Sequence, residues 1–239
     1  MSEPGERRAS PKRQLILRTA ARQFAHRPYA AVNLDDILAD AGLTKGAMYV
    51  HFASKQALAL AIIDDRTAMV RDAANKLLAR KLSGLETLID LVRLIALLDA
   101  GEDVARAGAH LLESIGGTDG LQAKLLGEWA NDMAVIVRRA VAEGDIVEHV
   151  DPEDVGRQLI ALYVGIRQAS GLDEPEVFLA NLEKAWLLAL PGFANPERIE
   201  YFTQFIRRRR AHAMGRTTPG KIPRDRRPGP RSAEARTRS

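Results

Sequence analysis

The stretch NLDDILADAGLTKGAMYVHFASK, residues 33–55, decides the fold. Asn33 is placed to cap a helix through its side-chain oxygen, and Asp36 follows three residues later, where the helix dipole favours a negative charge. Gly42 comes where the helix should end, because glycine tolerates the positive φ of a tight turn. The buried stripe of this predicted helix consists of Leu34, Ile37, Leu38 and Ala41.

A second, short helix is predicted to follow the turn, from Lys45 to about His51, with Thr44 as its cap. This helix should expose an ammonium, a phenol and an imidazole, from Lys45, Tyr49 and His51. Small residues, Gly46 and Ala47, would let another surface approach closely. These groups suit phosphates and base edges, so the pair of helices is a candidate helix-turn-helix for a DNA major groove. An ordinary helical hairpin with a cationic edge has the same geometry.

The residue pattern favours DNA binding. The series G-x-T-K-G-A-x-Y-x-H-F-x-S-K, from Gly42 to Lys55, resembles the DNA-binding motif of the TetR family of bacterial transcriptional repressors. The resemblance continues upstream through Ala20, Phe24 and Tyr29, although Pro28 replaces the glycine usual in that turn. It implies that the following residues contact double-stranded DNA: Asn33, Thr44, Lys45, Gly46, Ala47, Tyr49, His51 and Lys55.

Composition points to a helical protein of the cytoplasm. Hydrophobic residues make up 46% of the 239 residues, whereas aromatic residues make up only 5%, which favours helices over a β-sandwich. The chain has no cysteine, so disulfides, thiolate zinc sites and cysteine nucleophiles are excluded. No apolar run approaches the ~20 residues of a membrane span, and the N-terminus has no signal-peptide core. We therefore expect a cytoplasmic protein without membrane contact.

Charge is distributed unevenly along the chain. Residues 1–55 carry nine Lys/Arg against five Asp/Glu, residues 56–206 carry fourteen against twenty-four, and residues 207–239 carry twelve against two. An acidic middle between basic ends suits a protein whose central body stays away from DNA while its ends approach DNA. Uneven surface charge without a role is the alternative.

We predict an all-α fold of two helical domains between polar ends. Residues 1–10 should be a flexible basic arm, 11–55 the helix-turn-helix domain, 56–214 a ligand-binding and dimerisation domain, and 215–239 a disordered basic tail. The predicted helices cover about 11–26, 34–41, 45–51, 54–81, 84–101, 102–115, 121–143, 151–170, 174–190 and 196–213. The tail could add salt-sensitive DNA affinity or have no role.

The C-terminal part carries a second resemblance. The runs E-W-A-N-D-M (128–133), A-x-x-E-G-D-I (140–146), V-D-P-E-D-V (150–155), L-x-x-x-Y-V-G-I-R (159–167) and W-L-L-A-L-P-G (186–192) are similar to the γ-butyrolactone autoregulator receptors of actinobacteria. This resemblance implies a homodimer on a palindromic operator, released by a small-molecule effector. Trp129 matches the tryptophan that lies against the ligand's ring, although a plain core tryptophan is the alternative. The expected ligand-binding residues are Trp129, Arg66, Met133, Tyr163 and Val164.

Two of these residues depart from the receptor pattern. Arg66 stands where many such receptors place a glutamine, and Val164 where a threonine is common. Arg66 could pair with a ligand carboxylate, or structurally with Asp64 or Asp65. The altered polar lining indicates a different ligand, such as a drug or another metabolite, or an orphan regulator.

No enzyme signature stands out. His110 and Glu113 lie three apart on a predicted helix, and Ser114 follows, but one such pair does not make a metal site and no nucleophile–base pattern accompanies it. We therefore predict no cofactor, no metal and no catalytic residue. A hypothesis from another class remains: a helical interaction protein whose basic ends bind nucleic acid without sequence choice.

Overall fold

The computed structural model describes residues 10–117 and 119–216, with side chains described as far as residue 209. Residues 1–9 of the predicted arm and residues 217–239 of the predicted tail lie outside this part of the chain, whereas the last helix continues to Arg216, beyond its predicted end at 213 and into the predicted tail. The helices are α1 (Pro11–His26), α2 (Leu34–Ala41), α3 (Lys45–Tyr49), α4 (Lys55–Leu78), α5 (Gly84–Gly101), α6 (Asp103–Ile115), α7 (Leu121–Ala142), α8 (Pro152–Ser170), α9 (Pro175–Ala189) and α10 (Ile199–Arg216).

The predicted all-α class is confirmed. Within the described residues the only β pairing is an isolated antiparallel bridge between Ile146 and Ala194. Helix α3 is two residues shorter than predicted and α4 ends three residues earlier, at Leu78. Short 3₁₀ turns lie at Tyr29–Ala31 (η2), Leu190–Gly192 (η3) and Pro196–Arg198 (η4). The last of these turns delays the start of α10 to Ile199.

Local side-chain bonds fix several helix starts. The Ser54 hydroxyl accepts the Ala57 amide at the start of α4, and Ser83 with Glu86 forms a reciprocal capping box on α5. The Asp151 carboxylate accepts the amides of Glu153 and Asp154 at the start of α8. Pro152 then occupies the first position of α8, where a missing amide costs nothing.

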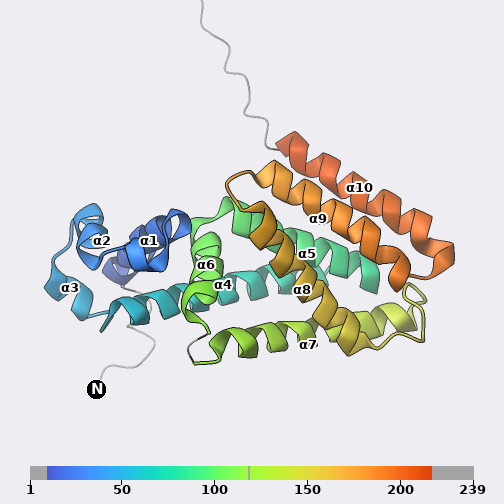
Figure 1. The fold of residues 1–239 in the computed structure, drawn as a ribbon, viewed down its shortest axis with the longest axis horizontal. Coiled ribbons are helices and arrows are strands. Elements are labelled where there is room, and N and C mark those ends of the chain that lie inside the picture. The colour runs from blue at the N-terminus through green and yellow to red at the C-terminus, as the bar shows by residue number, and fades with distance from the viewer. Residues whose placement is uncertain (1–9, 118, 217–239) are drawn as a thin grey trace, which may run out of the picture.

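Figure 1 shows α1, α2 and α3 grouped at one end of the molecule, with the long α4 running from them into the larger helical body. Two apolar clusters follow this division. The smaller includes Ile16, Phe24, Ile37 and Met48, and the larger includes Leu88, Val137 and Phe178.

The smaller cluster also takes in α4 residues as far as Ile63, and Ala107, Leu111 and Leu112 of α6. The predicted division of domains after residue 55 thus cuts through one continuous cluster, and it remains a proposal. Because α6 packs against both α1 and α4, it is the element through which the helical body contacts the N-terminal helices.

Candidate DNA-binding surface and effector site

The turn before α3 is set by local chemistry. Gly42 ends α2 in the left-handed region, with φ of 63°, and Thr44 Oγ1 accepts the Ala47 amide at 3.3 Å. The predicted side-chain cap by Asn33 is wrong, because Asn33 stands at the cap position of α2 without a capping bond from its side chain. Two carboxylates in the first turn, Asp35 and Asp36, supply negative charge there.

Helix α3 anchors one side chain in the core and presents the others outward. Met48 is fully buried among α1, α2 and α4 residues, which fixes the rotation of this short helix. Lys45 and Gly46 are exposed, and Tyr49 and Val50 are 54% and 75% exposed. Lys45 Nζ lies 2.9 Å from Asp35 Oδ1, and this carboxylate raises the pKa of Lys45. The predicted α3 residues therefore share one outward surface.

Lys55 is held by its own domain. Its ammonium donates to the Tyr29 carbonyl and lies 4.2 Å from the centre of the Tyr29 ring. Burial lowers the pKa of Lys55. Sequence reasoning named Lys55 for contact with DNA and missed this bond, because Tyr29 lies 26 residues away in the chain.

A buried ionic network lies among the predicted effector residues. Arg66 of α4 is 4% exposed, and its Nε and Nη2 donate to the two oxygens of Asp99 at 3.1 and 2.9 Å. The Tyr163 hydroxyl donates to the same carboxylate at 2.7 Å. The predicted partners of Arg66, Asp64 and Asp65, are therefore wrong: Asp99 is fully buried and directly opposite on α5.

Trp129 joins this network to both apolar clusters. The Arg66 guanidinium carbon lies 5.2 Å from the centre of the Trp129 ring, a cation–π contact. Trp129 is half-buried and packs against both the larger and the smaller cluster. Met133, one turn further along α7, is 3% exposed, while Val164 is partly buried against the larger cluster. Whether these five residues bind a ligand remains a prediction.

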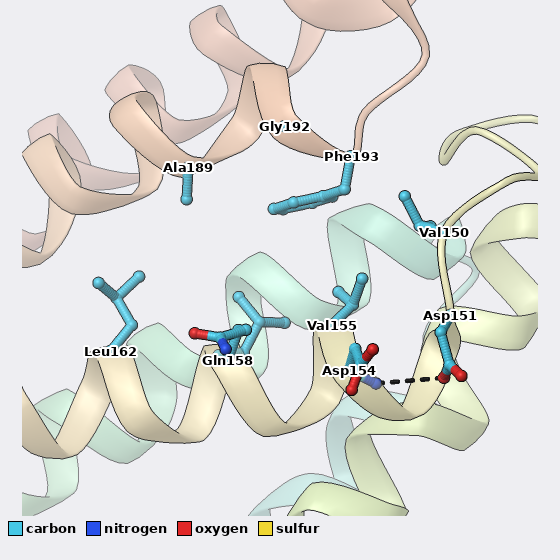
Figure 2. A pocket seen from close by; sticks show the side chains of 10 residues that line it. Val150, Asp151, Asp154, Val155, Gln158, Leu162, Ala189, Gly192 and Phe193 are labelled. Atoms are coloured by element: carbon cyan, nitrogen blue, oxygen red, sulfur yellow. Dashed lines mark hydrogen bonds between the residues drawn. The ribbon is translucent and has the colours of Figure 1, made fainter.

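A groove of about 490 Å³ lies elsewhere, between α8 and the end of α9 (Figure 2). Its apolar wall includes Val155 and Leu162 on one side and Phe193 on the other, while Asp151 and Asp154 stand at one end. Sequence reasoning missed this groove. The signal in the sequence was the cap of α8, which identifies a helix start but not an open space beside it.

The residues considered for an enzyme site, His110, Glu113 and Ser114, make structural contacts. The Glu113 carboxylate accepts from Arg167 and Gln168, and the Ser114 hydroxyl donates to the His110 carbonyl. His110 is half-buried beside α1, and burial lowers its pKa. Among the residues with described side chains, no group of three or more potential ligands could hold a metal ion. None of the described helices is both long enough and apolar enough to cross a membrane.

Known proteins agree with this arrangement. Residues 16–62 match the family of bacterial regulatory proteins, tetR family. The A-factor receptor protein of Streptomyces griseus is 30% identical over 182 residues, which cover 76% of this chain and 63% of that protein. The chain thus aligns with less than two thirds of this curated relative.

Solved structures extend the similarity over most of the fold. A γ-butyrolactone receptor described as an ArpA-like protein is 28% identical, with a TM-score of 0.71, over 86% of this chain and 98% of that chain. CprB from Streptomyces coelicolor, in complex with its operator sequence, is 29% identical, with a TM-score of 0.73, over 86% and 99% of the two chains.

An N-terminal helix-turn-helix joined by a long helix to a larger helical body is typical of TetR-type regulators, and residues 16–62 of this chain match that family. Within the family it resembles the ArpA-like γ-butyrolactone receptors.

Proposed function

We propose that the protein is a transcriptional repressor that binds a palindromic DNA operator as a homodimer and is released by a small apolar signal of the γ-butyrolactone type. The observation that carries the proposal is the exposed α3 surface, where Lys45, Gly46 and Tyr49 project from a helix locked to the core by Met48. The operator complex of a similar protein supports it. The proposal places the protein in the cytoplasm, with the DNA.

On DNA, α3 would enter the major groove. Lys45 would leave Asp35 and reach base edges or phosphate, and Tyr49 would contact bases or the backbone. Thr44, His51 and Asn33 stand at the margins of the same helix-turn-helix, where phosphate contacts fix its orientation. Lys55 would contribute through Tyr29, by holding the turn before α2, or by exchanging this carbonyl for a phosphate.

A dimer follows from the need to read two half-sites, and α8 and α9 carry apolar surface that a second copy could cover. Leu188 of α9 is 83% exposed, the largest exposure of any large hydrophobic side chain with a described environment. The apolar groove lined by Val155, Leu162 and Phe193 opens beside the same two helices (Figure 2). In a two-fold dimer, both of these apolar features could be covered by the partner subunit.

The effector would act where the two apolar clusters meet. A small molecule at Trp129 would contact Arg66 of α4, and α4 leads directly into the helix-turn-helix. A Cβ on Gly108 would lie 2.6 Å from the Arg66 Cβ, so α6 packs tightly on this same side chain. A displacement of Arg66 would therefore shift α4 and α6 together and move the recognition helices out of register with the DNA grooves.

DNase footprinting of the purified protein upstream of its own gene tests the proposal, with and without an organic extract of the culture. A protected palindrome that clears on addition of extract is expected. Lys45→Ala should weaken operator binding at least tenfold and lower the salt slope by about one. Lys124→Ala, an exposed α7 lysine, is the matched control. Equal operator affinity of the Lys45→Ala and Lys124→Ala proteins would contradict the role of α3.

A TetR-type sensor of a different signal is a second candidate, favoured by the same Arg66. Where many butyrolactone receptors place a neutral glutamine, this chain carries a buried charge. Neighbouring genes for a butyrolactone synthase and antibiotic biosynthesis would favour the butyrolactone signal, whereas efflux or catabolic genes would favour the second candidate.

A further inference from the structure

Three guanidinium groups are buried where α4, α5, α6 and α8 meet. Arg66, Arg106 and Arg167 are 4%, 8% and 7% exposed. Buried charges persist in proteins only when opposite charges and hydrogen bonds compensate their lost hydration.

The compensation is incomplete. Asp99 is fully buried and neutralises Arg66, while Glu113, with its side chain 24% exposed, neutralises Arg167. Arg106 relies on two carbonyl oxygens and on Asp173, whose side chain is 92% exposed and belongs to the surface. The buried part of the cluster therefore holds three positive charges against two negative ones.

Arg167 also lacks a bond. Its Nη2 donates to Glu113, but its Nε is buried without a hydrogen-bond partner among the described residues. An unmade bond from a charged donor is costly, so such a group favours an acceptor brought by another molecule. Arg167 follows Tyr163 by one turn of α8, and the charges of Arg66 and Arg167 both act to lower the Tyr163 pKa, against a larger rise from burial and Asp99.

Apolar side chains adjoin these charges. The half-buried Trp129 ring faces Arg66, and Met133 lies one turn along the same helix. The Arg66 guanidinium lies over one face of the indole ring, so a ligand ring on that face would have to displace it. A neutral ring that displaced it would leave Asp99 buried without its cation, which a buried carboxylate tolerates poorly.

We propose that the effector of this protein is a small amphipathic acid, whose carboxylate is held by Arg66 and Arg167 and whose apolar body lies against Trp129 and Met133. This inference rests on the proposed repressor function, favours the second candidate signal over a neutral lactone, and specifies the chemical class of that signal. A carboxylate supplies the missing negative charge, accepts from the unpaired Nε of Arg167, and matches the fork of donors on a guanidinium. The carbonyl of a neutral lactone could accept one hydrogen bond, but it supplies neither the charge nor the match to the fork.

Isothermal titration calorimetry on the full chain tests the proposal with two probes of equal size, octanoate and octanamide, which differ in charge. We expect octanoate to bind at least about tenfold more tightly, as one charge-assisted hydrogen bond would give. Arg66→Gln and Arg167→Gln should each remove this preference. Arg157→Gln, which changes an exposed arginine of α8, should retain it.

Equal binding of the two probes, an octanoate affinity unchanged in both variants, or no octanoate binding would each overturn the proposal. If Arg66→Gln alone unfolds the protein, the double variant Arg66→Gln/Asp99→Asn removes both buried charges and takes its place. A gel shift with the operator, run without any probe, is a separate measurement. If the gel shift showed no operator binding, the repressor proposal would fail while the acid-binding result stood. If the calorimetry showed no preference for octanoate, the acid proposal would fail while the repressor proposal stood.

Discussion

Lys45 of α3 and Asp35 of α2 form an ion pair across the helix-turn-helix, with 2.9 Å between Nζ and Oδ1. Both side chains are about two-thirds exposed, at 66% and 65%, so the pair adds little to folding stability. Its position matters more, because the pair places a carboxylate beside a lysine proposed to meet DNA. Binding would have to separate the two charges and bring Asp35 near phosphates.

Asp35→Asn should therefore tighten operator binding several-fold, because it frees Lys45 and removes a repulsion. The slope of log affinity against log salt should also steepen by up to about one, since one more cation is available to neutralise phosphate. Gel shifts at several salt concentrations measure both effects. Asp72→Asn removes an equally exposed carboxylate from an ion pair within α4 and should leave affinity unchanged. Weaker binding by Asp35→Asn would contradict this interpretation.

The Gly156 position should be intolerant of any side chain. A Cβ there would lie 2.5 Å from the Ala130 carbonyl oxygen and 3.0 Å from the Ala134 amide nitrogen, both backbone atoms of α7. Backbone cannot move aside as a side chain does, so Gly156→Ala should cost about 1–3 kcal/mol of unfolding free energy in urea titrations.

Gly127→Ala is the matched control for this substitution. Gly127 lies in α7 with no atom within 4 Å of an added Cβ, so the change should stabilise the helix by up to about 1 kcal/mol. If both variants had the same stability, the claim that α7 and α8 approach too closely at Gly156 for a side chain would be wrong.

His110 should make stability depend on pH. Burial, followed by the charge of Arg167, lowers its pKa, although its contact with the Phe24 carbonyl and the charge of Glu113 oppose this. The unfolded chain, with an ordinary pKa of about 6.5, therefore binds more protons than the folded chain below that pH. The stabilising effect is present above the unfolded pKa and is lost as the pH falls.

Thermal melts between pH 5 and pH 8 test this sign, with about 6.5 as the point below which stability should decline. In His110→Gln the decline should be smaller. His26, which lies 3.6 Å from Asp103 at the same α1–α6 contact, is the nearby histidine to compare. If His26→Gln rather than His110→Gln reduced the decline in stability, then His110 would not be the group responsible for it.

Most helices, and the caps and turns at their ends, could be predicted from the sequence, because they depend on residues that are neighbours in the chain. Thr44, Ser54 and Asp151 cap the predicted helices, and Gly42 adopts the left-handed turn. Asn33 fails as a side-chain cap, since residue type permits that bond without requiring it.

Long-range partners escaped the same reasoning. The bond between Arg66 and Asp99 spans 33 residues, and that between Lys55 and the Tyr29 carbonyl spans 26. No periodicity encodes which carboxylate of another helix will face a buried arginine, because this depends on how the helices pack. The nearby Asp64 and Asp65 were chosen by proximity in the chain, but they lie on the exposed side of α4.

The Tyr163 hydroxyl should carry a larger share of stability than other tyrosines in the described part of the chain. It donates to the fully buried Asp99 at 2.7 Å, and burial raises the pKa of Tyr163 well above its ordinary value. Tyr163→Phe leaves the ring in place and removes one donor to a charged acceptor, so it should cost about 1.5–3 kcal/mol.

Tyr201→Phe removes a bond to Glu86 from a tyrosine that is 43% exposed, where water replaces the lost partner. Urea unfolding of the two variants should separate them clearly, with Tyr201→Phe within about 0.5 kcal/mol of the parent protein. Equal losses of unfolding free energy in the two variants would mean that the Tyr163 hydroxyl does not stabilise the Arg66–Asp99 pair. The buried network would then consist of that ion pair alone.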